Sequence, residues 1–136
     1  MSNINATEER RDLRTPLARA RGLGSGKSGT EHFWRQRVTA IALALLVPWL
    51  VGLLVSMVGA DLAQARATIA RPWNAIMLAA LAIAMFWHAK LGLQVIVEDY
   101  VHTPWLAAVS QLAVIFVCAL AGLASVLAVI RISLGA

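Results

Sequence analysis

The sequence predicts an all-α membrane protein with three transmembrane helices. Apolar residues make up 60% of the 136 residues and charged residues only 14%, well below the ~25% of an ordinary soluble domain. Three windows contain no charged residue, namely 38–60, 72–89 and 100–130. Each window reaches the ~18 residues that indicate a membrane-spanning helix. We therefore expect transmembrane helices at about 38–58, 73–97 and 104–130.

The basic residues predict the orientation of these helices. The net charge is +5, and eight of the twelve Lys and Arg residues lie within residues 1–37. With three spans, the side that holds the N-terminus carries eight basic residues outside the helices, and the opposite side carries three. The positive-inside rule then predicts a cytoplasmic N-terminus and a periplasmic C-terminus. This one-sided charge indicates contact with membrane lipid, and we expect no nucleic-acid partner.

The N-terminal segment is polar and basic. We expect residues 1–30 to be partly disordered and residues 31–136 to form the three-helix domain. The Gly/Ser-rich stretch 22–29 is expected to be a linker, because Arg21 stands where a phosphate-binding loop needs its first glycine. A first apolar run that starts only after about 37 residues is not a signal peptide. The bacterial inner membrane is therefore the expected location, with the mitochondrial inner membrane as the alternative.

Proline residues set the expected helix boundaries. Pro48 is expected to kink the first helix. A short connection, about 60–71, follows that helix. Pro72 and Pro104 stand at the starts of the second and third helices, where a missing N–H does no harm. In the third helix, Ala121 and Ser125 are four residues apart, a spacing typical of closely packed membrane helices.

His88 is the most informative residue of the second helix. It lies fifteen residues after Trp73 and twelve before Tyr100, which places it ~18–22 Å from either end of the span. An imidazole at that depth can be a hydrogen-bonded structural group, a haem ligand or a proton relay. Gly92 lies four residues on, on the same face, and leaves room for a flat macrocycle or for helix packing. Lys90 is rotated by about 200° from His88 and is expected to reach toward the headgroups or to pair with an acid on a partner chain.

Asp99 and Tyr100 follow where the second helix reaches the membrane surface. A phenol can donate a hydrogen bond to a carbonyl oxygen, and a neighbouring acid can relay protons. This pair suits a quinone headgroup, although an aromatic residue at this level is also typical of the interfacial belt. His102 is expected to be solvated.

Two motifs carry a family resemblance. The pattern His88-x3-Gly92-x-Gln94-Val95-x2-Glu98-Asp99-Tyr100 resembles the second helix of the small hydrophobic anchor subunit of succinate dehydrogenase (respiratory complex II), a cytochrome b556-type anchor, the D subunit. The stretch 29–40, in which an aromatic precedes Arg37 and then Thr39-Ala40, resembles the start of that family's first helix.

The resemblance implies specific roles. His88 would be one axial ligand of haem b, the other coming from a second, larger hydrophobic cytochrome b anchor subunit. Tyr100 and Asp99 would bind ubiquinone, and Arg37, His32 and Gly92 would line the haem pocket near its propionates. The chain would dock the flavoprotein and iron–sulfur subunits for electron transport from succinate, in the tricarboxylic acid cycle, to quinone. It would not oxidise succinate itself, since it has no flavin fingerprint and only one cysteine.

Other functions stay open at this point. A fumarate reductase anchor would run the same chemistry in reverse. A small structural or transport membrane protein without haem would use His88 and Lys90 along a polar path, and would self-associate. A haem-free anchor would use His88 only for packing.

Overall fold

A computed structural model of the chain describes residues 16–17 and 29–135. The chain forms two compact units, Met1–Trp34 and Arg35–Ala136. Most of the predicted polar segment 1–30, including residues 22–28 of the Gly/Ser-rich stretch, falls outside the described residues. The second unit contains the residues around His88.

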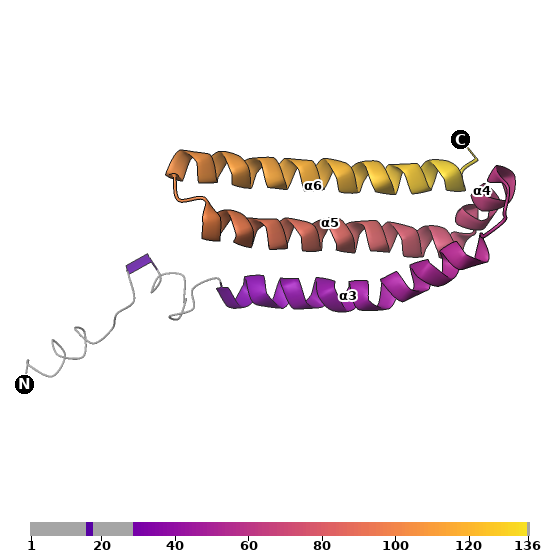
Figure 1. Ribbon diagram of the computed structural model, residues 1–136, viewed down its shortest axis with the longest axis horizontal. Helices are drawn as coiled ribbons and strands as arrows, with labels where there is room; N and C mark the ends of the chain where they lie inside the picture. The colour runs from indigo at the N-terminus through magenta and orange to yellow at the C-terminus, as the bar shows by residue number, and fades with distance from the viewer. Residues whose placement is uncertain (1–15, 18–28, 136) are drawn as a thin grey trace, which may run out of the picture. The chain divides into compact units, whose positions relative to one another are not determined.

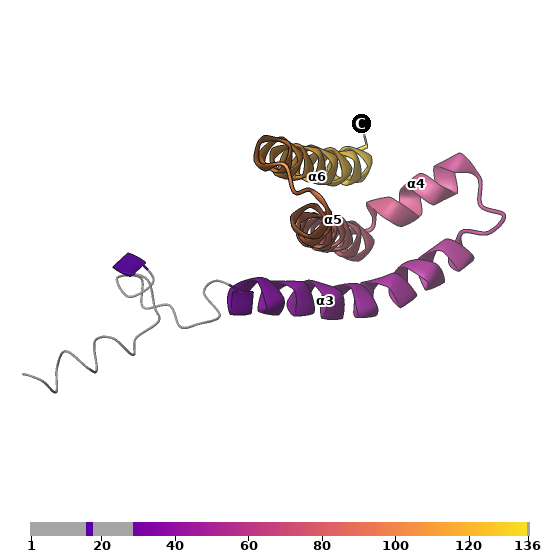
Figure 2. The same cartoon turned by 60° about the vertical axis from the view of Figure 1, so that its left-hand side comes forward.

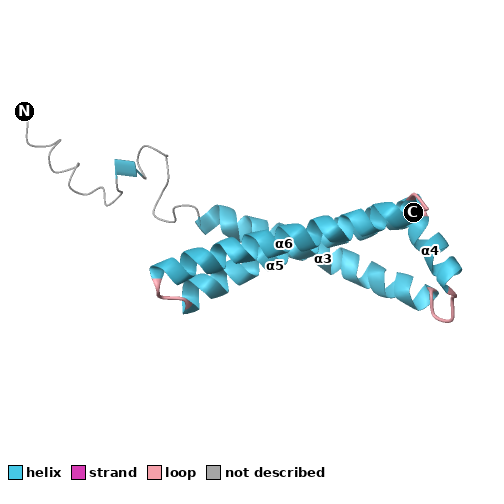
Figure 3. Ribbon diagram, turned by 90° about the horizontal axis from the view of Figure 1, so that it is seen from above, coloured by secondary structure: helices cyan, strands magenta, loops and turns pink. Residues whose placement is uncertain are grey.

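The described part of the chain contains four helices and loops (Figures 1 and 3). The helices are α3 (Gly29–Ser56), α4 (Leu62–Ala70), α5 (Pro72–Tyr100) and α6 (Pro104–Ser133). Three of them, α3, α5 and α6, are long and apolar enough to cross a membrane. The prediction of an all-helical protein with three spans is therefore confirmed.

Helix α3 begins earlier than the apolar window indicated. We expected a start near Val38, and the structure begins the helix at Gly29. The polar residues before Val38 include Glu, Gln and Arg, which are good helix formers, so the helix extends beyond its apolar part.

Pro48 lies inside α3, and the helix bends in its C-terminal half (Figures 1 and 2). Proline removes one backbone hydrogen bond there, which agrees with the predicted kink.

The connection at 60–71 contains a helix that we did not predict. Asp61 is the N-cap of α4 and forms a capping box with Gln64. The Gln64 N–H donates to Asp61 Oδ1 at 2.7 Å, and the Asp61 N–H donates to Gln64 Oε1 at 3.4 Å. The sequence signal was Asp-x-x-Gln directly before an alanine-rich run. Gly59, with φ of 80°, provides the turn before this helix.

Helices α5 and α6 lie side by side, and α5 lies between α6 and α3 (Figures 1 and 2). Toward the end where α4 connects them, α3 and α5 diverge (Figures 2 and 3). Helix α4 contacts both α5 and α6 there. This arrangement makes α5 the central helix of the second unit.

The packing between α3 and α5 is apolar along its middle. Leu46 of α3 packs with Leu81 and Ala84 of α5, and partly buried residues extend the cluster: Ala42, Leu43, Leu50 and Met77. On α5, positions 77, 81, 84, 88 and 91 repeat at intervals of four and three residues, so they share one face. His88 therefore belongs to the face of α5 that packs against α3.

Small residues allow α5 and α6 to approach closely. A Cβ at Gly122 would lie 3.4 Å from Phe86 Cβ, and Cys118 is buried nearby on the same helix. Ala121 and Ser125 are half-buried, and the Ser125 hydroxyl donates to the Ala121 carbonyl oxygen at 2.8 Å. The close approach occurs beside the predicted pair, at Gly122.

Many large apolar side chains point outward. Leu45, Trp73, Phe116 and Leu123 are among those exposed in the isolated chain. A soluble protein would not tolerate so much apolar surface. Lipid or partner helices are expected to cover it.

Candidate functional site

His88 lies half-buried on α5, between the apolar cluster around Ala84 and the buried Leu91, which is 3% exposed. Its ring faces α3 and contacts two polar residues of that helix, Gln36 and Thr39. Both residues come from the first turns of α3 that belong to the second unit. The sequence predicted the histidine, but it did not assign these two partners.

Thr39 makes the shorter contact with His88. The distance from Thr39 Oγ1 to His88 Nδ1 is 3.0 Å. The same hydroxyl lies 3.0 Å from the carbonyl oxygens of Arg35 and Gln36 in its own helix. The contact therefore connects the imidazole of α5 to the backbone of α3.

Gln36 faces the other ring nitrogen. Its amide nitrogen Nε2 lies 3.5 Å from His88 Nε2, which is long for a hydrogen bond. Its amide oxygen Oε1 is buried and has no hydrogen-bond partner among the described residues. An unsatisfied buried oxygen costs free energy.

Gly92 is next to the same amide. A Cβ added at Gly92 would lie 3.8 Å from Gln36 Nε2, which is an ordinary contact distance. Room for a macrocycle beside Gly92 stays a prediction, and in the structure the Gln36 amide lies next to this position.

These residues fit the haem that the family resemblance implies. The His88 Nδ1 has a good hydrogen-bond partner, the Nε2 has only a long one, and a glycine lies one turn away. The amide beside Nε2 gains little from staying there. Within the described residues, no group of three or more His, Cys, Asp or Glu could hold a metal ion.

The predicted propionate residues lie on α3. Arg37 is exposed and follows Gln36 directly, so its side chain points about 100° away around the helix. His32 is half-buried and belongs to the first unit.

The predicted quinone residues lie at the end of α5, away from His88. Tyr100 is the last residue of the helix and is 78% exposed, and Asp99 is exposed as well. Asp99 is eleven residues from His88, which corresponds to roughly 17 Å along the axis. His102 is exposed, as expected. The structure does not bring the phenol and the imidazole together, so they belong to two different sites.

A polar contact connects α5 and α6 close to this end. The Gln111 amide nitrogen donates to the Gln94 carbonyl oxygen at 3.3 Å and to Glu98 Oε1 at 3.4 Å. The Gln111 Oε1 is buried and has no hydrogen-bond partner in the described part of the chain. Gln111 was not predicted to have a role, although a polar residue inside an uncharged window was a visible signal.

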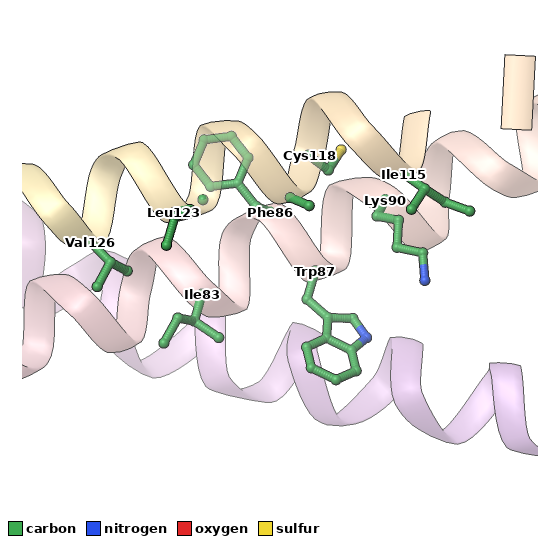
Figure 4. A pocket seen from close by; sticks show the side chains of 10 residues that line it. Ile83, Phe86, Trp87, Lys90, Ile115, Cys118, Leu123 and Val126 are labelled. Atoms are coloured by element: carbon green, nitrogen blue, oxygen red, sulfur yellow. The ribbon is translucent and has the colours of Figure 1, made fainter. Parts of the chain in front are cut away.

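A cavity of about 490 Å³ lies between α5 and α6 (Figure 4). Almost all of its lining is apolar, and Lys90 is the exception. Phe86 and Lys90 are each two residues from His88 and so lie on the other side of α5. The cavity is therefore separate from the surroundings of His88, and the structure places Lys90 and His88 on different sides of α5.

Comparison with known proteins identifies the relatives of the chain. Residues 11–122 match the family model described as "Succinate dehydrogenase/Fumarate reductase transmembrane subunit". The chain is 38% identical over 90 residues to the succinate dehydrogenase hydrophobic membrane anchor subunit of Rickettsia bellii, covering 66% of this chain and 72% of the relative.

A second relative is matched over nearly its full length. The subunit of the same name from Paracoccus denitrificans is 34% identical over 122 residues, which cover 90% of this chain and 94% of the relative. The succinate dehydrogenase membrane anchor subunit of Reclinomonas americana is 33% identical over 82 residues, which cover 56% of this chain and 66% of the relative. No solved structure shows significant similarity.

Proposed function

Since the chain belongs to the family of succinate dehydrogenase/fumarate reductase transmembrane subunits, we propose that it anchors a succinate:quinone oxidoreductase in the bacterial inner membrane. Its partners are a flavoprotein, an iron–sulfur protein and a second hydrophobic cytochrome b subunit. The exposed apolar residues of the spans support a partner within the membrane. The observation that carries the proposal is the family match over residues 11–122.

Succinate oxidation is the proposed direction. The family model covers both succinate dehydrogenase and fumarate reductase subunits. The three relatives described above are all named as succinate dehydrogenase subunits, which favours succinate as the electron donor.

The N-terminus is proposed to be cytoplasmic and the C-terminus periplasmic. The support is the concentration of basic residues in 1–37. A cysteine placed at Ser133 should then react with a membrane-impermeant reagent added to intact cells, whereas one placed at His102 should not. The reverse pattern would show the opposite orientation.

We propose that His88 would bind the iron of haem b through Nε2, with a further ligand from the partner cytochrome b subunit. Haem b, when bound, supplies a one-electron centre within the membrane. In this chain Gly92 would leave space on the same face as His88, and Arg37 and His32 would donate hydrogen bonds to the propionates.

Tyr100 and Asp99 are proposed to form this chain's part of the ubiquinone site. Both are exposed at the surface end of α5, where a quinone headgroup can be reached from lipid. The Tyr100 O–H would donate to the quinone carbonyl oxygen, and Asp99 would exchange protons with water. The partner subunits would supply the remaining residues of the ubiquinone site.

Purification of the native assembly through this chain tests the proposal. Solubilisation in a mild detergent should recover a flavoprotein, an iron–sulfur protein and a second hydrophobic chain in equal amounts. Recovery of the chain as a self-associated species without a flavoprotein would favour the structural or transport alternative and contradict the anchor function.

A further inference from the structure

We propose that Thr39 is a positioning residue for the haem ligand His88. The Thr39 hydroxyl accepts a hydrogen bond from His88 Nδ1–H and so orients His88 Nε2 toward the iron. The inference rests on the proposed haem function. It assigns a role to a residue on a different helix from the ligand. The contact that carries it is the 3.0 Å distance from Thr39 Oγ1 to His88 Nδ1.

The hydrogen atoms around Thr39 indicate the direction of this bond. A threonine hydroxyl has one proton to donate. Two of its three neighbours, the carbonyl oxygens of Arg35 and Gln36, can only accept. With the hydroxyl proton directed to these carbonyls, the third contact requires a proton on His88 Nδ1.

Gln36 supports the same assignment from the other side of the ring. A neutral imidazole carries a proton on only one nitrogen. The atom facing His88 Nε2 is the amide nitrogen of Gln36, which is a donor. In the opposite tautomer, the His88 Nε2–H would face the Gln36 amide N–H. Both groups are hydrogen-bond donors, so no hydrogen bond could form between them. The two α3 residues therefore favour the same tautomer, with its lone pair on Nε2.

The two partners differ in what happens when iron binds. To bind iron, His88 would use its Nε2 lone pair, and the Gln36 amide would then give up only a contact of 3.5 Å. Thr39 contacts the opposite nitrogen and can stay. Its hydroxyl is held on the backbone of its own helix, and its β-branched side chain has few rotamers. Thr39 thus keeps the ring oriented with and without iron.

The hydrogen bond has an electronic consequence. A ligating histidine that donates its second N–H becomes a stronger electron donor to the metal. A stronger donor stabilises ferric haem relative to ferrous haem, so a hydrogen bond donated by the ligating histidine lowers the midpoint potential of the haem. Loss of the Thr39 hydroxyl should therefore raise the midpoint potential of the haem.

The test compares Thr39→Val with Thr39→Ser in the purified complex. Valine keeps the shape and removes the hydroxyl, and serine keeps the hydroxyl. Ser56→Ala is the matched control, because Ser56 also donates to its own helix backbone, to Leu53 O at 2.7 Å. Haem content, the low-spin electron paramagnetic resonance signal and the midpoint potential are measured for each complex.

Thr39→Val should shift the potential upward and weaken haem retention about 10–100-fold. Thr39→Ser and Ser56→Ala should behave like the unmodified complex. Unchanged haem content and potential in Thr39→Val would overturn the inference while leaving the haem function in place. An unmodified complex without haem would overturn both. If the valine variant does not assemble, Thr39→Ala provides the same comparison.

Discussion

At the scale of single residues, the imidazole of His88 lies where α5 packs against α3, and its two ring nitrogens have polar contacts of different length. Thr39 contacts Nδ1 at 3.0 Å, and Gln36 approaches Nε2 only to 3.5 Å. A neutral imidazole whose second nitrogen has only a long contact can use that nitrogen to bind a metal. The Oε1 of the same Gln36 amide is buried and has no hydrogen-bond partner among the described residues.

Gly92→Ala tests whether a flat ligand uses the room next to His88. The new Cβ would meet only Gln36 Nε2, at 3.8 Å, and alanine favours helix by up to about 1 kcal/mol over glycine. We therefore expect normal assembly but lower haem content or a shifted haem spectrum.

Gly52→Ala is the control for this variant, since a Cβ at Gly52 would have no neighbour within 4 Å. Equal haem spectra in the two variants would show that the haem does not approach Gly92.

Tyr100→Phe tests the quinone contact. Tyr100 is 78% exposed, so the change should leave assembly intact. Loss of one hydrogen bond is worth about 0.5–1.5 kcal/mol, so ubiquinone reduction should fall by up to about tenfold while succinate oxidation with an artificial acceptor is retained.

His102→Ala, close by and also exposed, serves as the control for Tyr100→Phe and should affect neither activity. A Tyr100→Phe complex that loses both activities equally would argue against a quinone contact at this residue.

At the scale of helices, the spans were predictable and their partners were not. Windows without charge predicted α3, α5 and α6, because apolar length is what a membrane requires. The polar start of α3 was missed, since helix formation depends on backbone hydrogen bonds and continues beyond the apolar part. Helix α4 was missed although Asp61 and Gln64 carried a capping signal.

The same holds for the residues around His88: the histidine could be predicted from its own helix, and its partners could not. His88 stood out because it lies in the middle of an apolar span. Thr39 and Gln36 lie 49 and 52 residues away in sequence, and their role depends on how α3 packs against α5. No periodicity within one helix contains that information.

Asp61→Ala tests the capping box of α4. Removal of an N-cap side chain costs about 0.5–2 kcal/mol, so the backbone amides of the first turn of α4 should exchange with deuterium several-fold faster. Asp61→Asn keeps a good cap and should exchange like the unmodified chain. Equal exchange in all three proteins would show that the box does not hold this helix.

At the scale of the whole molecule, the chain is one part of a larger site. It offers a single histidine from α5, an exposed phenol at the end of that helix, and extensive exposed apolar surface on its spans. Under the proposed function each of these features needs a partner: a second haem ligand, the remainder of a quinone pocket, and further helices or lipid. An anchor subunit of a membrane oxidoreductase explains all three together.

The reduced-minus-oxidised optical spectrum of the purified complex tests the central claim most directly. The unmodified complex and His102→Ala should show the same b-type haem signal. His88→Ala should lose or alter that signal while the flavoprotein remains attached. A normal spectrum in His88→Ala would contradict the assignment of His88 as the haem ligand.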